Sequence, residues 1–112
     1  MKKKIYSILN ELCVPCHLKG RDFIEAAINI VLLNKKTSIT KELYPMIAEK
    51  FETTSSRVER GIRHAISTSL EVCPNEALIK YFGKRKAAQN ISNGEYIFSI
   101  AKYIEVFCDE SL

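Results

Sequence analysis

Residues 51–66 read FETTSSRVERGIRHAI, and their spacing predicts a helix with two contrasting faces. Placed on a helix over about residues 55–70, their apolar and basic side chains separate onto opposite faces. The apolar face consists of Val58, Ile62, Ala65, Ile66, Ser69 and Leu70. The polar face consists of Arg57, Arg60, Arg63, His64 and Ser67. Such a helix can bury one face in a small core and present the other to phosphates and base edges.

A second, shorter helix is expected just before this one, from Pro45 to Phe51, across a tight polar turn. Ser56 and Glu59 fit a capping box for the longer helix, with Thr53 and Thr54 as the alternative caps. Two helices in this order form a helix-turn-helix, in which the second helix enters the major groove of DNA. The pattern therefore predicts a sequence-specific DNA-binding domain.

The rest of the chain also shows helical periodicity. A first helix with Ile5, Ile8, Leu9 and Leu12 inward ends at Val14, which precedes a proline. Gly20 is interpreted as a second break, and Asp22 as the cap of an apolar helix running to about Asn34. Because that helix is apolar nearly all round, we expect it to be central and buried.

A short helix is expected from Pro74 to about Gly83, followed by a basic loop that begins at Lys84. Residues 92–95 form a second candidate capping box. The last helix then places inward Ile97, Phe98, Ile100, Ala101, Ile104 and Phe107. No strict alternation typical of strands occurs, so the sequence predicts an all-α fold of six helices, as a single domain over residues 1–112.

Composition narrows the class of protein. The chain has 112 residues, 46% of them hydrophobic and 27% charged, which is ordinary for a globular protein with a core. The net charge of +4 is a mild bias, so the placement of the basic residues matters more than their sum. We expect no membrane span and no export signal, and hence a cytoplasmic, nucleoid-associated protein with reduced cysteines. No enzyme motif is present, so neither an enzyme activity nor a cofactor is expected.

Three stretches carry a resemblance to a known family. They read VPxHxKG at residues 14–20, ITKxLYPxIAxKF at 39–51 and TTxSRVERxIRHAI at 53–66. From about Ile5 to Phe107, the chain resembles the C-terminal effector domain of the stage zero sporulation protein A family. These are response regulators that start sporulation in endospore-forming bacteria. The resemblance implies a six-helix domain that binds short boxes with a GTCG-like core in double-stranded DNA, often as a homodimer on tandem boxes.

The resemblance also implies that Arg57, Glu59, Arg60, Arg63 and His64 face the DNA. We assign base recognition to Glu59, Arg60 and His64, with His64 toward the flanking bases. Arg60 suits a bidentate contact to guanine, and Glu59 can accept from cytosine N4, each discriminating by about 1–3 kcal/mol. Contacts to phosphates or flanking bases are assigned to Thr53, Thr54, Ser55, Arg57, Arg63, Lys84 and Arg85.

The sequence departs from the family pattern in three ways. We expect no receiver domain here, so phosphorylation would not control this domain in cis. Gly61 stands where the family usually has alanine; a helical glycine costs roughly 0.5–1 kcal/mol but allows close approach. Cys13 and Cys16 replace residues that are not normally cysteines.

These cysteines keep a second class of function open. Residues 13–17 read CVPCH, the haem attachment pattern, and Cys13, Cys16 and His17 with Cys73 or Cys108 would make four zinc ligands. The alternative is that the cysteines pack as small hydrophobes, and we expect no metal. A further alternative is a stand-alone interaction protein that acts on RNA polymerase or on a full-length regulator.

Overall fold

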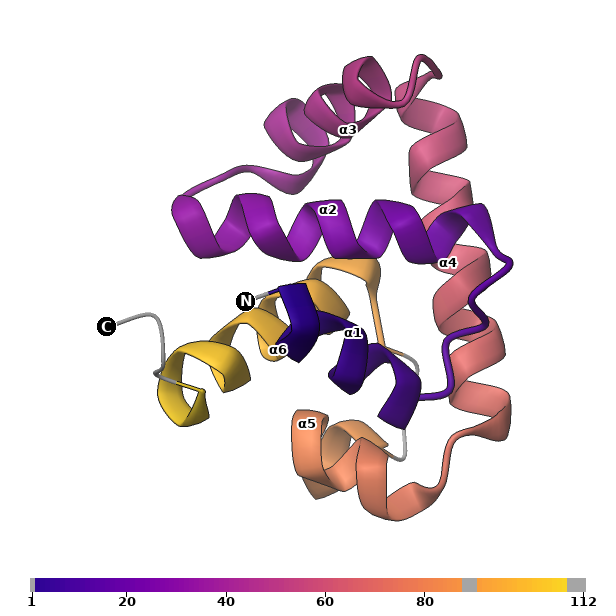
Figure 1. Ribbon diagram of the computed structural model, residues 1–112, viewed down its shortest axis with the longest axis vertical. Coiled ribbons are helices and arrows are strands. Elements are labelled where there is room, and N and C mark those ends of the chain that lie inside the picture. Colours follow the sequence, from indigo (N-terminus) through magenta and orange to yellow (C-terminus); the bar gives the residue numbers. More distant parts are fainter. Residues whose placement is uncertain (1, 88–90, 109–112) are drawn as a thin grey trace.

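The computed structural model describes residues 2–87 and 91–108, except for the side chains of residues 85–87. In this part of the chain the elements are α1 (Lys2–Glu11), α2 (Lys19–Leu33), η1 (Ile39–Leu43), α3 (Tyr44–Lys50), α4 (Ser55–Val72), α5 (Asn75–Ala87) and α6 (Asn93–Phe107). The segment η1 is a π-helical turn that leads directly into α3. The described residues contain no strand, and the predicted all-α fold of six helices is confirmed (Figure 1).

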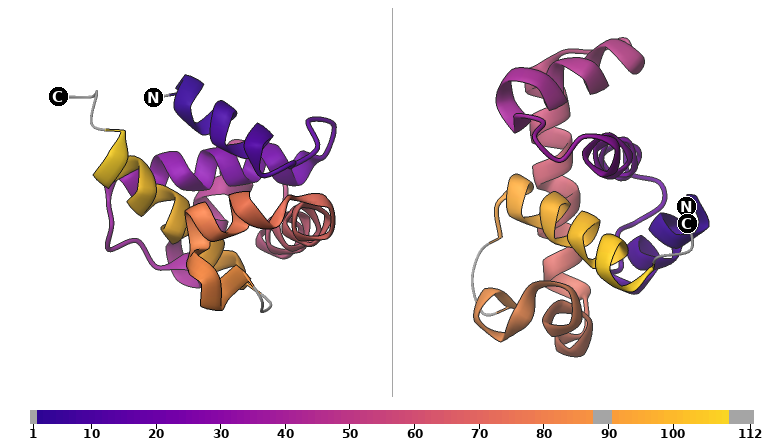
Figure 2. Two further views of the ribbon diagram at one scale, coloured as in Figure 1. Left: turned by 90° about the horizontal axis from the view of Figure 1, so that it is seen from below. Right: turned by 90° about the vertical axis from the view of Figure 1, so that its left-hand side faces the viewer.

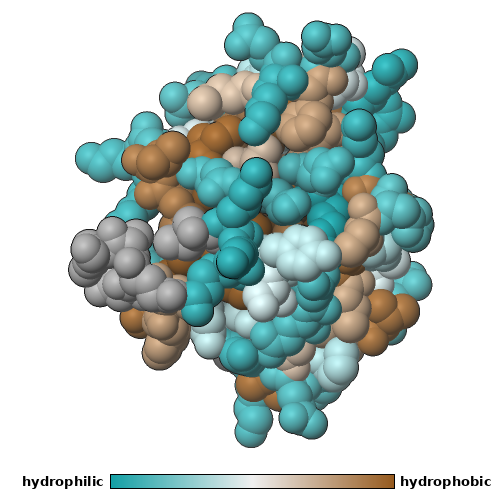
Figure 3. Space-filling view, in the orientation of Figure 1, coloured by the Kyte–Doolittle hydropathy of each residue, from teal (hydrophilic) through white to brown (hydrophobic). Residues whose placement is uncertain are grey.

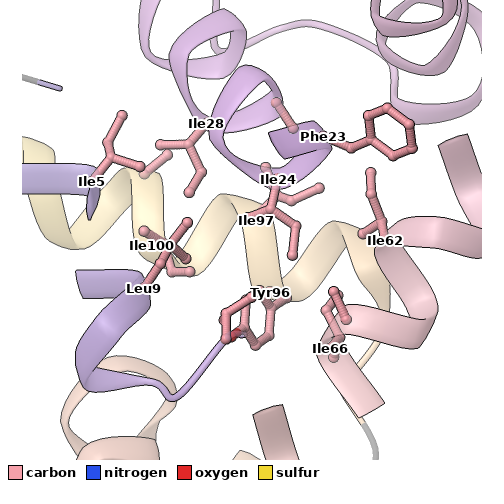
Figure 4. Packing of buried hydrophobic residues seen from close by; sticks show 14 of the residues in the cluster. Ile5, Leu9, Phe23, Ile24, Ile28, Ile62, Ile66, Tyr96, Ile97 and Ile100 are labelled. Carbon is pink, nitrogen blue, oxygen red and sulfur yellow. The ribbon is translucent and has the colours of Figure 1, made fainter. Parts of the chain in front are cut away.

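Helix α2 is the centre of the structure, as its apolar sequence predicted. It packs against α1, α3, α4 and α6, and it runs across the middle of the molecule between α3 and α6 (Figure 1). Side chains from four helices converge on one core, seen in Figure 4. Labelled there are Ile5, Leu9, Phe23, Ile24, Ile28, Ile62, Ile66, Tyr96, Ile97 and Ile100.

The prediction that Gly20 interrupts helical structure was wrong, as was the assignment of Asp22 as the N-cap of the second helix. Helix α2 already begins at Lys19, with Leu18 as its N-cap residue, and Gly20 lies in its first turn. A Cβ atom on Gly20 would lie 2.1 Å from the carbonyl oxygen of Gly61 in α4. Gly20 is therefore explained by the contact of two helix backbones, and its small size sets how closely α2 and α4 cross.

The C-terminus of α1 ends in a Schellman motif. The Val14 amide donates to the Leu9 carbonyl, and the Cys13 amide donates to the Asn10 carbonyl, both at 3.0 Å. Cys13 occupies the left-handed position of this motif, with φ of 60°. Glycine is the usual residue there because a Cβ atom makes the conformation unfavourable.

Side chains from α2 and α4 donate hydrogen bonds to backbone carbonyl groups of α1 and of the segment that follows it. Arg21 is only 2% exposed, and its guanidinium donates to the carbonyl oxygens of Val14 at 2.6 Å and Tyr6 at 3.2 Å. The Ser69 hydroxyl of α4 donates to the Leu12 carbonyl at 2.7 Å. Because buried carbonyl groups need partners, these bonds fix the α1–α2 connection against α4.

Two expectations near the C-terminus were wrong. Gly83 interrupts α5 as predicted, with φ of 85° and ψ of 161°, but residues 84–87 return to helical geometry and do not form a loop. Phe107 is 70% exposed and lies outside the core, because the last turn of α6 extends beyond the helices that cover the rest of it.

The capping box of residues 92–95 is confirmed: Ser92 Oγ accepts from the Glu95 amide at 3.1 Å.

Candidate nucleic-acid interface

The turn between α3 and α4 is closed by backbone hydrogen bonds at the end of α3. The Thr53 amide donates to the Ala48 carbonyl at 2.9 Å, and the Glu52 amide donates to the Glu49 carbonyl at 3.3 Å. Glu52 is left-handed, with φ of 54°. This is a second Schellman motif, with glutamate at the position that favours glycine. It reverses the chain within a few residues and so forms the turn of a helix-turn-helix.

Thr54 is the N-cap of α4, and the capping box predicted for Ser56 and Glu59 is wrong. Thr54 has extended backbone angles, and its Oγ1 accepts from the Arg57 amide at 3.2 Å. Residues 52 and 53 complete the Schellman motif of α3, so Thr54 is the first residue free to cap the next helix. The alternative assignment of the cap to Thr54 is confirmed.

Replacing Thr54 with alanine is expected to lower the free energy of unfolding by about 1 kcal/mol, because the Arg57 amide loses its acceptor. Urea denaturation followed by circular dichroism measures this change. The matched control is Ser56→Ala, which changes an exposed side chain two residues after Thr54, and for which we expect a change within about 0.5 kcal/mol. Equal effects of the two substitutions would contradict the assignment of Thr54 as the cap.

Phe23 of α2 packs against both helices of the helix-turn-helix, α3 and α4. Its ring packs edge-on against Phe51 at the end of α3, with centroids 5.2 Å apart. The same ring lies against Gly61, where a Cβ atom would be 3.0 Å from Phe23 Cε2. The apolar face of α4 is buried as predicted, through Val58, Ile62, Ala65, Ile66 and Ser69. The position of α4 is therefore set by the core.

The opposite face of α4 is exposed, as its sequence predicted. Its exposed residues include Arg57, Arg60, Arg63, His64 and Ser67. Within the described residues, the side chains of Arg57, Arg60 and His64 make no hydrogen bond or ion pair. In Figure 3, hydrophilic residues crowd the outer edge of the molecule over α3 and the first half of α4. Side chains without internal partners on a fixed helix are able to bind an external acceptor.

Glu59 and Arg63 are joined on this helix. Arg63 Nη1 lies 2.8 Å from Glu59 Oε2, one helical turn away. The Asn93 side-chain amide of α6 donates to the Glu59 carbonyl at 3.2 Å and to the Tyr44 hydroxyl at 3.0 Å. Burial raises the pKa of Tyr44 above its ordinary value, so its hydroxyl stays protonated. Asn93 thus links α3, α4 and α6 beside Glu59.

Asn93 and Tyr44 were not predicted as site residues. Asn93 lies inside the capping box that begins α6, and that local role was the only one the sequence indicated. Its contact with Glu59 joins residues far apart in the chain. A side-chain amide directly after a capping serine is the only signal in the sequence, and it does not specify the partner.

The structure brings most of the predicted contacts together but separates one of them. Thr53 and Ser55 are half-buried and Thr54 is exposed, all at the start of α4. Lys84 is exposed on α5, and α5 lies at the C-terminal end of α4, opposite α3, in Figures 1 and 2. The Arg85 side chain lies outside the described residues.

The cysteine pattern of residues 13–17 lies on the α1–α2 connection. Cys16 and His17 are exposed, and Cys13 is half-buried. Across residues 2–87 and 91–108, no three His, Cys, Asp or Glu side chains gather in an arrangement that would hold a metal ion.

A comparison with families of known proteins matches residues 5–104 to the family described as the sporulation initiation factor Spo0A C terminal. The match runs from α1 to α6 and includes both helices of the helix-turn-helix. The chain belongs to the Spo0A C-terminal family. Spo0A C-terminal domains are DNA-binding domains of sporulation-initiation regulators, and the family is not one of enzymes. The family inferred from the sequence motifs is confirmed. None of the described helices is long and apolar enough to span a bilayer.

Proposed function

We propose that this domain recognises a GTCG-core box in double-stranded DNA by inserting the first half of α4 into the major groove. The observation that carries this proposal is the exposed face of α4, where the side chains of Arg57, Arg60 and His64 have no internal partner in the described structure. Burial of the other face fixes the helix against the core. A fixed helix with unpaired guanidinium groups suits both guanine edges and phosphates.

Base choice would come mainly from Arg60 and Glu59. Arg60 is exposed and can donate two parallel hydrogen bonds to guanine O6 and N7. The bond from Arg63 occupies Glu59 Oε2, which leaves Oε1 to accept from cytosine N4. Arg63 would therefore orient the Glu59 carboxylate and also contact the phosphate backbone of the DNA. His64 would contact bases at the edge of the box.

Phosphate contacts would come from the start of α4 and from its arginines. Thr53, Thr54 and Ser55 lie at the helix N-terminus, where the amide groups and the dipole favour an anion. Lys84, on α5, would reach only phosphates flanking the box, and we propose the same for Arg85. Binding to tandem boxes as a homodimer, contact with RNA polymerase and a nucleoid location in the cytoplasm belong to the same proposal.

A fluorescence-anisotropy titration at two salt concentrations tests this function. It compares a duplex carrying a GTCG-core box with a duplex of the same composition in scrambled order. A preference of about a thousandfold, within the range of specific regulators, is the expected result. Equal, salt-sensitive affinities would contradict base recognition, and absence of binding to both would favour the stand-alone interaction protein.

Replacing Arg57 with alanine is expected to weaken binding to both duplexes equally. The side chain is exposed next to the helix N-terminus, so we assign it to a phosphate. Losing one phosphate contact should reduce the slope of log affinity against log salt by about 0.9. The control is Ser67→Ala, an exposed and uncharged position of the same helix, for which the slope should stay constant. An unchanged slope for Arg57→Ala would remove Arg57 from the phosphate contacts.

A further inference from the structure

Two cysteines that are far apart in the sequence meet at one carbonyl group. Cys13 follows α1, and Cys73 follows α4. The Sγ atoms of both residues lie 3.8 Å from the carbonyl oxygen of Glu11. Cys13 is also close enough to contribute, after burial, to the raised pKa of the Cys73 thiol. The fold therefore holds a pair of thiols between the α1–α2 connection and the C-terminal end of α4.

The backbone at Cys13 is held in a conformation that is unfavourable for cysteine. Cys13 takes up the left-handed position of the Schellman motif, which favours glycine. The bonds from Arg21 to the Val14 carbonyl and from Ser69 to the Leu12 carbonyl hold this conformation on either side of Cys13. An unfavourable conformation that its surroundings keep in place is a reason to look for a role of the side chain.

We propose that Cys13 and Cys73 are an oxidative modification site, a dithiol that closes to an intramolecular disulfide with a peroxide or a disulfide oxidant. Neither residue lies inside a regular helix, because Cys13 is in a turn and Cys73 is the C-cap of α4. Closure requires these two ends to bring the sulfur atoms to the bonding distance of about 2.0 Å. Both residues are half-buried, so a small oxidant can reach the pair.

The chemistry balances with hydrogen peroxide as the oxidant. Burial raises the pKa of the Cys73 thiol to about 11, so Cys73 stays protonated near neutral pH and Cys13 reacts first. Cys13 Sγ attacks one peroxide oxygen, the O–O bond breaks, and the thiol proton leaves with hydroxide as water. Cys73 Sγ then attacks Cys13 Sγ, and the S–O bond breaks with release of a second water. Two thiols are oxidised and one peroxide is reduced.

Formation of the Cys13–Cys73 disulfide should change the thermal stability of the domain. The bond would join residues 13 and 73 and restrict the unfolded chain between them, so the oxidised protein should melt at a higher temperature. The exposed arginines lie on the first half of α4, away from Cys73 at its C-terminal end. Affinity for a GTCG-core duplex should therefore change by less than about twofold. This last expectation rests on the proposed function, whereas the disulfide and the melting temperature do not.

The test uses the full chain with Cys16→Ser and Cys108→Ser, which leaves only Cys13 and Cys73. The reduced protein is treated with hydrogen peroxide, blocked with iodoacetamide and examined by intact mass and peptide mapping. The expected result is the loss of two hydrogen atoms, a Cys13–Cys73 peptide, and a higher melting temperature that dithiothreitol reverses. The matched variant with Cys73→Ser in addition should give no intramolecular bond.

Two results would overturn the proposal. One is the absence of a monomeric cross-link in the two-cysteine protein while its circular dichroism shows a folded domain. The other is a bond between Cys13 and Cys16 in the unmodified chain, with Cys73 left free for alkylation. The second result would assign the C-x-x-C pair of the sequence to the oxidative chemistry. Because neither readout involves DNA, failure of this proposal is distinguishable from failure of the proposed function.

Discussion

Replacing Gly20 with alanine is expected to lower the free energy of unfolding by about 2 kcal/mol or more. The added Cβ would lie 2.1 Å from the Gly61 carbonyl oxygen and 2.8 Å from its carbonyl carbon. Both atoms are backbone, so relief requires α2 and α4 to move apart. Overpacking of this kind typically costs about 1–3 kcal/mol and sometimes more. The better helix propensity of alanine offsets at most about 1 kcal/mol.

The matched control lies on the other side of the same crossing. In Gly61→Ala the new Cβ would lie 3.0 Å from Phe23 Cε2, which belongs to a side chain that can shift. Because alanine also favours the helix by about 1 kcal/mol, we expect a net change within about 1 kcal/mol. Urea denaturation of both variants measures the difference. A Gly20→Ala protein as stable as the parent would contradict the backbone contact between α2 and α4.

The two faces of α4 could be predicted from sequence because they depend on helical period alone. Val58 and Ile62 are spaced to lie on one side, and Arg60 and Arg63 on the other, whatever surrounds the helix. The capping box at Ser92 is similarly local, since its partners are three residues apart. Local spacing therefore gave the helix-turn-helix and most of the candidate interface.

Features that depend on contacts between distant segments could not be predicted in this way. Gly20 has the same local appearance whether it ends a helix or allows another backbone to approach, and only Gly61 distinguishes the two. Cys13 and Glu52 hold left-handed positions that glycine signals in other sequences. The contact of Asn93 with Glu59 also requires the folded chain.

Arg60→Ala is the prediction that separates base recognition from general attraction to DNA. We expect it to weaken binding to the GTCG-core duplex by about 1–3 kcal/mol, or roughly 5- to 150-fold, and to relax the preference at one base pair. Binding to the scrambled duplex should fall far less. Arg60 is exposed and has no internal partner in the described structure, so its removal should leave the fold and its melting temperature unchanged.

The decisive comparison is Arg60→Lys. Lysine keeps the positive charge but cannot donate two parallel bonds to guanine O6 and N7 from one planar group. If Arg60 recognises guanine, the lysine variant should keep the affinity for the scrambled duplex and lose most of the preference for the GTCG-core duplex. If Arg60 binds a phosphate, lysine should restore nearly all of the affinity lost in Arg60→Ala on both duplexes. Anisotropy at two salt concentrations distinguishes these outcomes, because only the second changes the salt slope of the alanine variant by about one.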